Sequence, residues 1–173
     1  MVPKKVSSIK TKKLKMKEGF RMAEYPLLES VYMNPEELPW IPWMEGVQFK
    51  LLKANPINGQ FFVLLQASKG AAMPAHYHHG TVIVYTIQGA WNYEGEDWIS
   101  KAGDVIFEPA GSLHTPIMRS EEDVIVLNIL DGLLDFQDDV GNSIFKLNWV
   151  AALDMYKAYC DATGTEFKDL TKF

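Results

Sequence analysis

Short apolar and β-branched stretches, separated by turn residues, follow one another from residue 47 to residue 130. Residues 47–52 alternate apolar and polar positions, whereas residues 61–65 form a continuous apolar run. Gly-containing pairs such as Asn58-Gly59 mark turns between these stretches. Strands so closely spaced predict an all-β sandwich or barrel rather than alternating strands and helices. The further strands expected are 81–87, 89–93, 97–100, 105–107, 115–118 and 124–130.

The end of the chain has a helical pattern instead. Between about residues 149 and 162, apolar residues recur at spacings of three and four, which predicts a C-terminal α-helix. Asn148 is a suitable N-cap and Gly164 a suitable stop. Cys160 is the only cysteine and lies within this helix, so we expect a small buried apolar residue and no internal disulfide. The absence of a disulfide favours a reducing, cytoplasmic setting.

A proline- and tryptophan-rich segment, residues 37–44, precedes the strands. Its prolines exclude a helix interior, so we expect an extended segment across the outside of the core or across a subunit interface. Aromatic residues are enriched at interface centres. Trp40 and Trp43 therefore indicate a homodimer, a homotetramer or a larger assembly.

Length and charge divide the chain into an arm and a body. The 173 residues fit one domain, predicted to span 25–173 and to follow a basic arm at 1–24. Residues 1–21 carry a net charge of +7, which leaves −12 on the remaining chain. Such an arm can bind nucleic acid or an anionic membrane, but we favour a solvated arm that packs loosely on the body or on a second subunit. Accordingly we expect no nucleic-acid partner, and the lack of a long apolar stretch predicts no membrane helix.

Candidate chemistry is concentrated in the histidines. Three of the four lie at positions 76, 78 and 79, and the fourth is His114. In a strand, residues i and i+2 point to one face, so His76 and His78 would aim two imidazoles at one point while His79 points away. Two converging imidazoles suit a transition metal. A His-x-His pair by itself is more often an ordinary polar pair. The surrounding sequence must therefore indicate whether this pair binds a metal.

That context resembles the two signature motifs of the cupin superfamily. The first motif is Gly, five residues, His-x-His, three or four residues, Glu, six residues, Gly; the second is Gly, five residues, Pro-x-Gly, two residues, His, three residues, Asn. Eight positions match in register, and they are Gly70, His76, His78, Gly89, Gly103, Pro109, Gly111 and His114. The resemblance implies a cupin-type jelly-roll barrel, the double-stranded β-helix, with the basic arm before it and the helix after it.

Two motif positions depart from the pattern. Val82 stands where most cupins carry a metal-binding Glu, and Met118 replaces the Asn of the second motif. The usual site of three His and one Glu would then become a three-His site, with open positions for an anionic bidentate ligand and dioxygen. The alternative is a metal site that has decayed, although decay would more often affect the histidines as well.

Within the cupins, residues 37–47, 85–89 and 108–115 resemble the 2,4'-dihydroxyacetophenone dioxygenase group. The name covers related barrels that include metal-binding sensors. The resemblance implies non-haem Fe(II) held by His76, His78 and His114, with O₂ as co-substrate. The implied reaction cleaves a C–C bond of a small carbonyl compound. For 2,4'-dihydroxyacetophenone the products would be 4-hydroxybenzoate and formate.

A proton acceptor would be needed beside the metal. Glu108 interrupts an apolar run next to the turn before His114, and a carboxylate facing the barrel interior would have a raised pKa suited to a base. The alternative places Glu108 outside, paired with a lysine, because alternation does not identify the inner face. Tyr93 is a second candidate, for orienting substrate, with simple packing as its alternative.

Two other functions stay open: a zinc-binding sensor without turnover, and a three-His dioxygenase that acts on a β-diketone.

Overall fold

The computed structural model describes residues 30–173, of which residues 31–173 form one compact unit. The predicted boundary between arm and body at residue 24 lies outside the described residues and stays a prediction. Within residues 30–173 no helix is long and apolar enough to cross a membrane.

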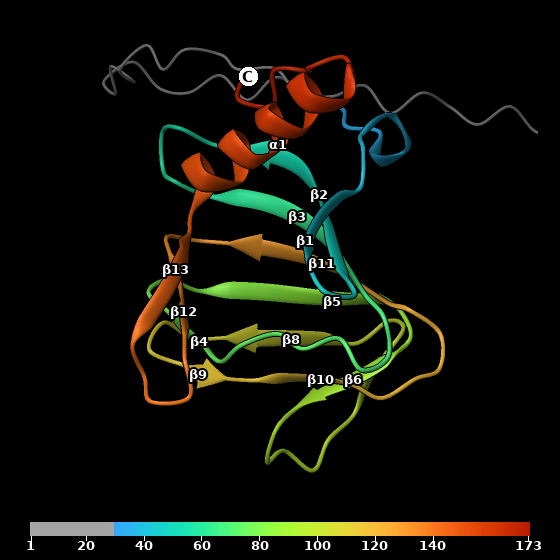
Figure 1. Cartoon of the computed structure of the whole chain (residues 1–173), viewed down its shortest axis with the longest axis vertical. Helices are drawn as coiled ribbons and strands as arrows, with labels where there is room; N and C mark the ends of the chain where they lie inside the picture. Colours follow the sequence, from blue (N-terminus) through green and yellow to red (C-terminus); the bar gives the residue numbers. More distant parts are fainter. Residues whose placement is uncertain (1–29) are drawn as a thin grey trace, which may run out of the picture. The chain divides into compact units, whose positions relative to one another are not determined.

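The body consists of three antiparallel sheets and one α-helix (Figure 1). The first sheet has six strands in the order β1-β2-β3-β11-β5-β8. These are Ile41–Met44, Val47–Ala54, Phe61–Ala67, Val124–Leu130, Val82–Gln88 and Val105–Glu108. The second sheet is β10 (Pro116–Met118), β6 (Ala90–Tyr93) and β7 (Ser100–Lys101). The third is β13 (Ser143–Leu147), β12 (Leu134–Gln137), β4 (His76–His78) and β9 (Leu113–His114).

The apolar core lies on the inner face of the six-stranded sheet. Alternate residues of β3, β11 and β5 are buried there, except for the half-buried Asn128 on β11, and the residues between them are half-buried or exposed. Strands far apart in sequence pair in this sheet, since β11 lies between β3 and β5. The predicted all-β jelly roll with a C-terminal helix is thus confirmed, although the three sheets are not hydrogen-bonded into one closed barrel.

Most predicted strands exist, but the one expected at 97–100 is largely wrong. Only Ser100–Lys101 is a strand, and it pairs with the start of β6. The preceding residues form a loop, in which the Asn92 side chain donates to the Glu96 carbonyl over 2.9 Å. Trp98 turns inward, with its ring centre 6.1 Å from that of Trp91. Packing against neighbouring aromatic rings, and not the alternation of a strand, therefore sets the inward position of the Trp98 side chain.

The proline- and tryptophan-rich segment is extended, as predicted, but its tryptophans are not an exposed interface. Trp43 lies on β1 and packs edge-to-face against Phe49 and Phe136, at ring-centre distances of 5.9 and 5.2 Å. Lys50 places its ammonium group 4.9 Å from the centre of the Trp40 ring. Both tryptophans are half-buried, so they give no support to the predicted oligomer, which remains untested.

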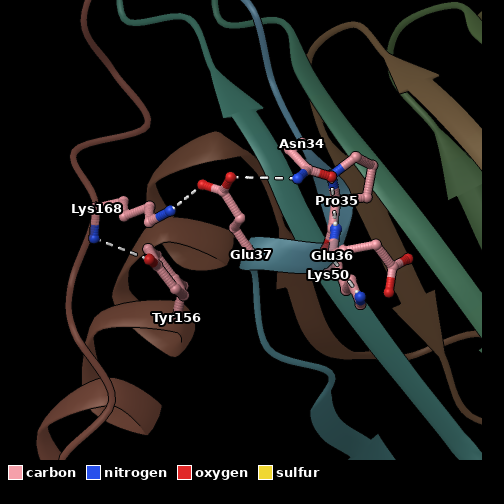
Figure 2. A network of polar contacts seen from close by, with 7 residues as sticks. All are labelled: Asn34, Pro35, Glu36, Glu37, Lys50, Tyr156 and Lys168. Atoms are coloured by element: carbon pink, nitrogen blue, oxygen red, sulfur yellow. Dashed lines mark hydrogen bonds and ion pairs between the residues drawn. The ribbon is translucent and has the colours of Figure 1, made fainter.

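A short 3-10 helix, η1 (Pro35–Glu37), and the chain after α1 are joined by a polar network (Figure 2). Asn34 caps η1 through the Glu36 amide at 3.2 Å, and its side-chain amide donates to Glu37 over 3.2 Å. Glu37 forms an ion pair with Lys168, whose backbone amide donates to the Tyr156 hydroxyl over 2.9 Å. These contacts hold the last residues against the helix.

The helix α1 spans Trp149–Thr163, close to its predicted bounds. The Asn148 side chain accepts a hydrogen bond from the Ala151 amide over 2.9 Å, and Gly164 ends the helix with a φ of 71°. This left-handed conformation suits glycine. Cys160 is buried, as predicted.

Candidate metal centre

Two neighbouring strands bring the three predicted histidines together. His76 and His78 lie at the two ends of β4 with both side chains buried, and the register of β4 with β9 places His114 opposite His76. One ligand nitrogen from each ring lies within 4.8 Å of the other two. Strand alternation therefore delivers two imidazoles and strand pairing delivers the third.

The turn before His114 is fixed directly to β4. The His78 amide donates to the Ser112 carbonyl over 2.9 Å, and the Gly111 amide donates to the His78 carbonyl over 2.8 Å. Gly111 has a φ of 93°, a conformation that L side chains rarely adopt. The Pro-x-Gly part of the second motif therefore positions its histidine through backbone hydrogen bonds.

All three imidazoles are neutral at physiological pH. Burial lowers the pKa of His76, and burial with neighbouring histidines lowers the pKa values of His78 and His114 to about 3. The Nδ1 atom of His76 lies 3.1 Å from the Pro74 carbonyl oxygen, where it donates as N–H and leaves Nε2 as an acceptor. Neutral imidazole is the form that binds metals.

Three ring nitrogens in this group have no hydrogen-bond partner among the described residues, although they are buried. They are Nδ1 and Nε2 of His78 and Nε2 of His114. Buried polar atoms without partners are rare and call for an explanation. A divalent transition metal bound by His76, His78 and His114 would account for one nitrogen of each ring, because each imidazole offers one lone pair to a shared point.

Glu108 lies inside the barrel beside the histidines and is only 3% exposed. Tyr93 donates a hydrogen bond to its Oε1 atom. The other oxygen, Oε2, lies 3.5 Å from Nδ1 of His78 and 3.9 Å from Nε2 of His114. Because these histidines are neutral, the contacts are not ion pairs. Burial raises the Glu108 pKa to about 7, opposed in part by the Tyr93 hydrogen bond.

Tyr93 has a second contact in the centre. Its ring is stacked on the His114 imidazole, with centres 3.6 Å apart and planes 10° from parallel. Burial, followed by the nearby Glu108 carboxylate, raises the Tyr93 pKa further above its ordinary value, so the phenol stays protonated. Tyr93 thus orients both the carboxylate and one imidazole.

The two motif departures also face the interior. Val82 is 1% exposed and lies directly across from Glu108 in the pairing of β5 with β8. Met118 is also buried, and like Val82 it borders an inner cavity beside His76 and His78. His79, by contrast, is exposed, as the strand pattern predicted.

Two spaces meet at this centre. An inner cavity of about 70 Å³ is bordered by His76 and His78, and an open cleft of about 570 Å³ is bordered by His114. Tyr93 and Glu108 border both. Sequence analysis missed several cavity residues because plain apolar or amide side chains carry no motif. Among them are Trp43, Asn128 and Phe136.

Known proteins share this fold and sequence pattern. An RmlC-like cupin protein from Ralstonia eutropha JMP134 is 40% identical, over 84% of this chain and 96% of its own, with a TM-score of 0.79. An acetylacetone dioxygenase from Acinetobacter johnsonii is 20% identical, over 81% of this chain and 98% of its own, with a TM-score of 0.67. The second likeness shows the fold alone.

The anti-sigma protein ChrR, solved in complex with SigE from Rhodobacter sphaeroides, is also similar. That match has 28% identity and a TM-score of 0.50, over 57% of this chain and 52% of the other. No curated protein matches the sequence. The family model of the ChrR cupin-like domain matches residues 28–132, which include all three histidines. The chain therefore belongs to the ChrR cupin-like domain family of cupins.

Proposed function

We propose that the protein is a non-haem Fe(II) dioxygenase that cleaves the C–C bond of a small α-hydroxyketone with O₂. One observation carries the proposal: a buried carboxyl group lies between two neutral imidazoles of a three-histidine cluster. Glu108 Oε2 lies within 3.9 Å of both His78 and His114. Three imidazoles can hold a metal without this carboxyl group, and a buried carboxyl group beside them is placed to accept a substrate proton.

The metal, held by His76, His78 and His114, would supply Lewis acidity toward the substrate's carbonyl and hydroxyl oxygens and a place for O₂. Cleavage between the two oxygenated carbons gives two carboxylic acids, and both atoms of O₂ enter the products. The reaction consumes one ketone and one O₂, so no other reductant or oxidant is required.

Glu108 is the proposed base. With a pKa of about 7, this carboxyl group exists partly as carboxylate near neutrality and can accept a proton. Tyr93 holds Oε1 by a hydrogen bond, so Oε2 is the oxygen left to receive the proton. The Tyr93 phenol cannot compete as a base, because its own pKa is raised.

The two spaces favour a substrate that reaches the centre from the cleft. The inner cavity of about 70 Å³ holds only a few water-sized groups, which is too little for an aromatic ring. The cleft of about 570 Å³ is bordered by Trp98, Ile99 and Ile106, apolar side chains suited to a ring. An aromatic α-hydroxyketone such as 2,4'-dihydroxyacetophenone fits this division, and its products would be 4-hydroxybenzoate and formate.

Two other functions have their own support. Oxidation of a β-diketone is supported by the shared fold with acetylacetone dioxygenases. A zinc-binding sensor without turnover is supported by the family match and by the similarity to the anti-sigma protein ChrR. Three neutral imidazoles suit zinc as well as iron.

The test is reconstitution of the metal-free protein with Fe(II) under anaerobic conditions, followed by O₂-electrode assays. We expect O₂ consumption with 2,4'-dihydroxyacetophenone, in equal amounts with formate released. A matched sample loaded with Zn(II) should consume none. O₂ consumption only with acetylacetone would indicate that the substrate is a β-diketone and not an α-hydroxyketone. No O₂ consumption with either compound, despite bound iron, would favour the sensor.

A further inference from the structure

One polar side chain on the inner face of the six-stranded sheet has no role in the metal centre. Asn128 lies on β11, where its ladder partners are Val63 on β3 and Val84 on β5. Both valines are buried, and both border the inner cavity together with Asn128. Because residues directly opposite each other in a ladder share one face of the sheet, the Asn128 side chain extends toward the cavity.

Asn128 differs from the other asparagines in its hydrogen bonding. An asparagine side chain has two N–H donors and a carbonyl oxygen that accepts. Within residues 30–173, every asparagine except Asn128 makes a side-chain hydrogen bond, and these six are Asn34, Asn55, Asn58, Asn92, Asn142 and Asn148. Asn128 is half-buried beside the cavity, so its amide is available to a group that enters there.

The titratable groups that border the inner cavity already have roles. His76 and His78 belong to the three-histidine cluster, and Tyr93 donates a hydrogen bond to Glu108. Most other side chains around the cavity are apolar, so Asn128 presents an amide in apolar surroundings. A polar group without a partner in such a place is costly, and a bound polar ligand would recover that cost.

The strand ladders place Asn128 one row away from Glu108. Leu130, two residues after Asn128, pairs with Val82, and Val82 pairs with Glu108. At strand spacings of about 4.8 Å and a rise of about 3.4 Å per residue, the Cα atoms of Asn128 and Glu108 lie roughly 12 Å apart. Both side chains border the cavity, so a ligand of a few atoms can lie between the amide and the carboxyl group.

The size of the inner cavity limits which end of a substrate can reach Asn128. About 70 Å³ admits the hydroxymethyl end of an α-hydroxyketone but not an aromatic ring. A hydroxyl group donates and accepts hydrogen bonds, and an asparagine amide complements both. The corresponding end of acetylacetone is a methyl group, which does neither and would leave the amide unpaired.

Building on the proposed function, we propose that Asn128 is a specificity-determining residue that recognises the hydroxyl group of the α-hydroxyketone. The hydrogen bond runs to the hydroxyl itself or to one water bound to it. A site built to hydrogen-bond a substrate hydroxyl rejects an analogue that lacks it, because the polar group of the site is then unpaired. Asn128 therefore distinguishes an α-hydroxyketone from a β-diketone, which three imidazoles alone do not.

Titration calorimetry of the Zn(II)-loaded protein tests this recognition without turnover. The two ligands are 2,4'-dihydroxyacetophenone and 4'-hydroxyacetophenone, which differ only in the α-hydroxyl group. Asn128→Leu keeps the approximate shape of the side chain and removes the amide. We expect it to raise the Kd of the first ligand about 10-fold and that of the second less than about 2-fold. The difference isolates the contact between the amide and the hydroxyl group.

Val126→Ile is the matched control, because Val126 lies on the same strand and borders the same cavity. It adds a methylene group and removes no polar group, so both Kd values should change by the same factor. Circular dichroism identifies a variant that does not fold. If Asn128→Leu is such a variant, the smaller Asn128→Val replaces it with the same expected result.

The outcomes separate this inference from the proposed reaction. Equal loss of affinity for both ligands in a folded Asn128 variant would overturn the inference, and so would a wild-type protein that does not bind 2,4'-dihydroxyacetophenone. If the wild type consumes O₂ with this compound in the Fe(II) form while the Asn128 variant shows equal losses, the reaction stands and the recognition is wrong. If the hydroxyl-dependent loss occurs but the Fe(II) protein consumes no O₂, the recognition stands and the reaction is wrong.

Discussion

The two oxygens of Glu108 have different neighbours, and this asymmetry defines its proposed role. Oε1 accepts a hydrogen bond from Tyr93, and Oε2 points toward His78 and His114. Burial raises the carboxyl pKa to about 7. A carboxylate held at one oxygen and open at the other is suited to accept a proton at a fixed place.

Glu108→Gln should separate proton acceptance from metal binding. The amide keeps the shape but cannot accept a proton, so kcat should fall by roughly 10²–10⁴-fold while iron content is unchanged. In the wild type, kcat/KM should rise with pH and level off above an inflection at or below about 7, since a bound cation lowers this pKa. The variant should lack that rise.

Glu94→Gln is the control for this prediction, because Glu94 is exposed in a turn and borders neither the cavity nor the cleft. Its rates and pH profile should match the wild type. If Glu108→Gln instead loses iron, the carboxyl group belongs to the metal site itself. If it turns over normally, the proposed base is wrong.

At the residue scale, the motif spacing could identify the three histidines from the sequence, but it could not show which way Glu108 points. Val105, Ile106 and Phe107 are all apolar, so alternation between apolar and polar residues cannot show which side of β8 faces inward. The structure shows that Glu108 shares the inner side with Ile106, while Val105 and Phe107 are exposed. The pattern was ambiguous because the outward side of β8 carries exposed apolar residues instead of polar ones.

The pairing of β5 with β8 places two motif-related positions side by side. Val82 occupies the position where most cupins carry a carboxylate, and its partner across the ladder is Glu108. The carboxyl group beside the histidines thus comes from the next strand. Among the described residues, Glu108 is the only acidic side chain that borders the inner cavity, and this would leave space beside a bound metal for the substrate.

Val82→Glu tests this reading of the strand pair. A second carboxylate should tighten metal binding, because it adds an anionic ligand, and lower turnover, because it occupies a position that the substrate needs. Isothermal titration with Zn(II) and O₂ uptake with Fe(II) measure the two effects. Val82→Ile is the control for added bulk, and it should not tighten binding. Unchanged O₂ uptake in Val82→Glu would show that residue 82 does not face the metal.

The connection after β4 is held against the turn between β11 and β12. His79 donates its amide to the Leu133 carbonyl over 2.9 Å, and Asp131 donates to the Thr81 carbonyl over 2.9 Å. Gly80 lies between these bonds, where an added Cβ would come within 2.0 Å of the Asp131 carbonyl oxygen. The two nearest atoms are the backbone oxygen and carbonyl carbon of Asp131, so no flexible side-chain end can move aside.

Gly80→Ala should therefore lower the free energy of unfolding by about 3 kcal/mol and weaken metal binding, since His78 is two residues away. Urea denaturation and zinc titration measure these changes. Gly95→Ala is the control, because its Cβ would meet nothing within 4 Å and only the left-handed φ is strained. We expect it to cost about 1 kcal/mol without affecting the metal. Equal effects would contradict the steric explanation.

Element prediction succeeded where burial produced a clear periodicity. Residues 61–65 and 124–130 are strands because alternate positions face the core. The strand β12 alternates buried and half-buried residues but was missed because four residues are too short for a clear period, and β13 was missed because most of its positions are exposed. Pairing of β12 with β4 also depends on contacts between residues far apart in the sequence, which no local pattern reveals.

At the scale of the whole molecule, the six-stranded sheet separates two kinds of surface. Its inner face borders the cavity and carries Glu108, and its outer face exposes apolar side chains such as Ile83, Tyr85 and Phe107. Val105 and Phe107 also border the cleft, so the apolar outer face reaches the edge of the route to the histidines.

Metal binding should also stabilise the whole fold, because the three histidines come from strands separated by about 40 residues in sequence. A ligand that binds only the folded state at 100 times its dissociation constant adds about 2.7 kcal/mol. For a domain of this size that corresponds to a rise in Tm of about 5–10 °C. Scanning calorimetry of the metal-free protein with and without Zn(II) should show this rise, and EDTA should reverse it. Replacing His76, His78 or His114 by Ala should abolish the shift, whereas His79→Ala should retain it because its side chain is exposed. The same loss in all four variants would mean that the cluster is not the binding site.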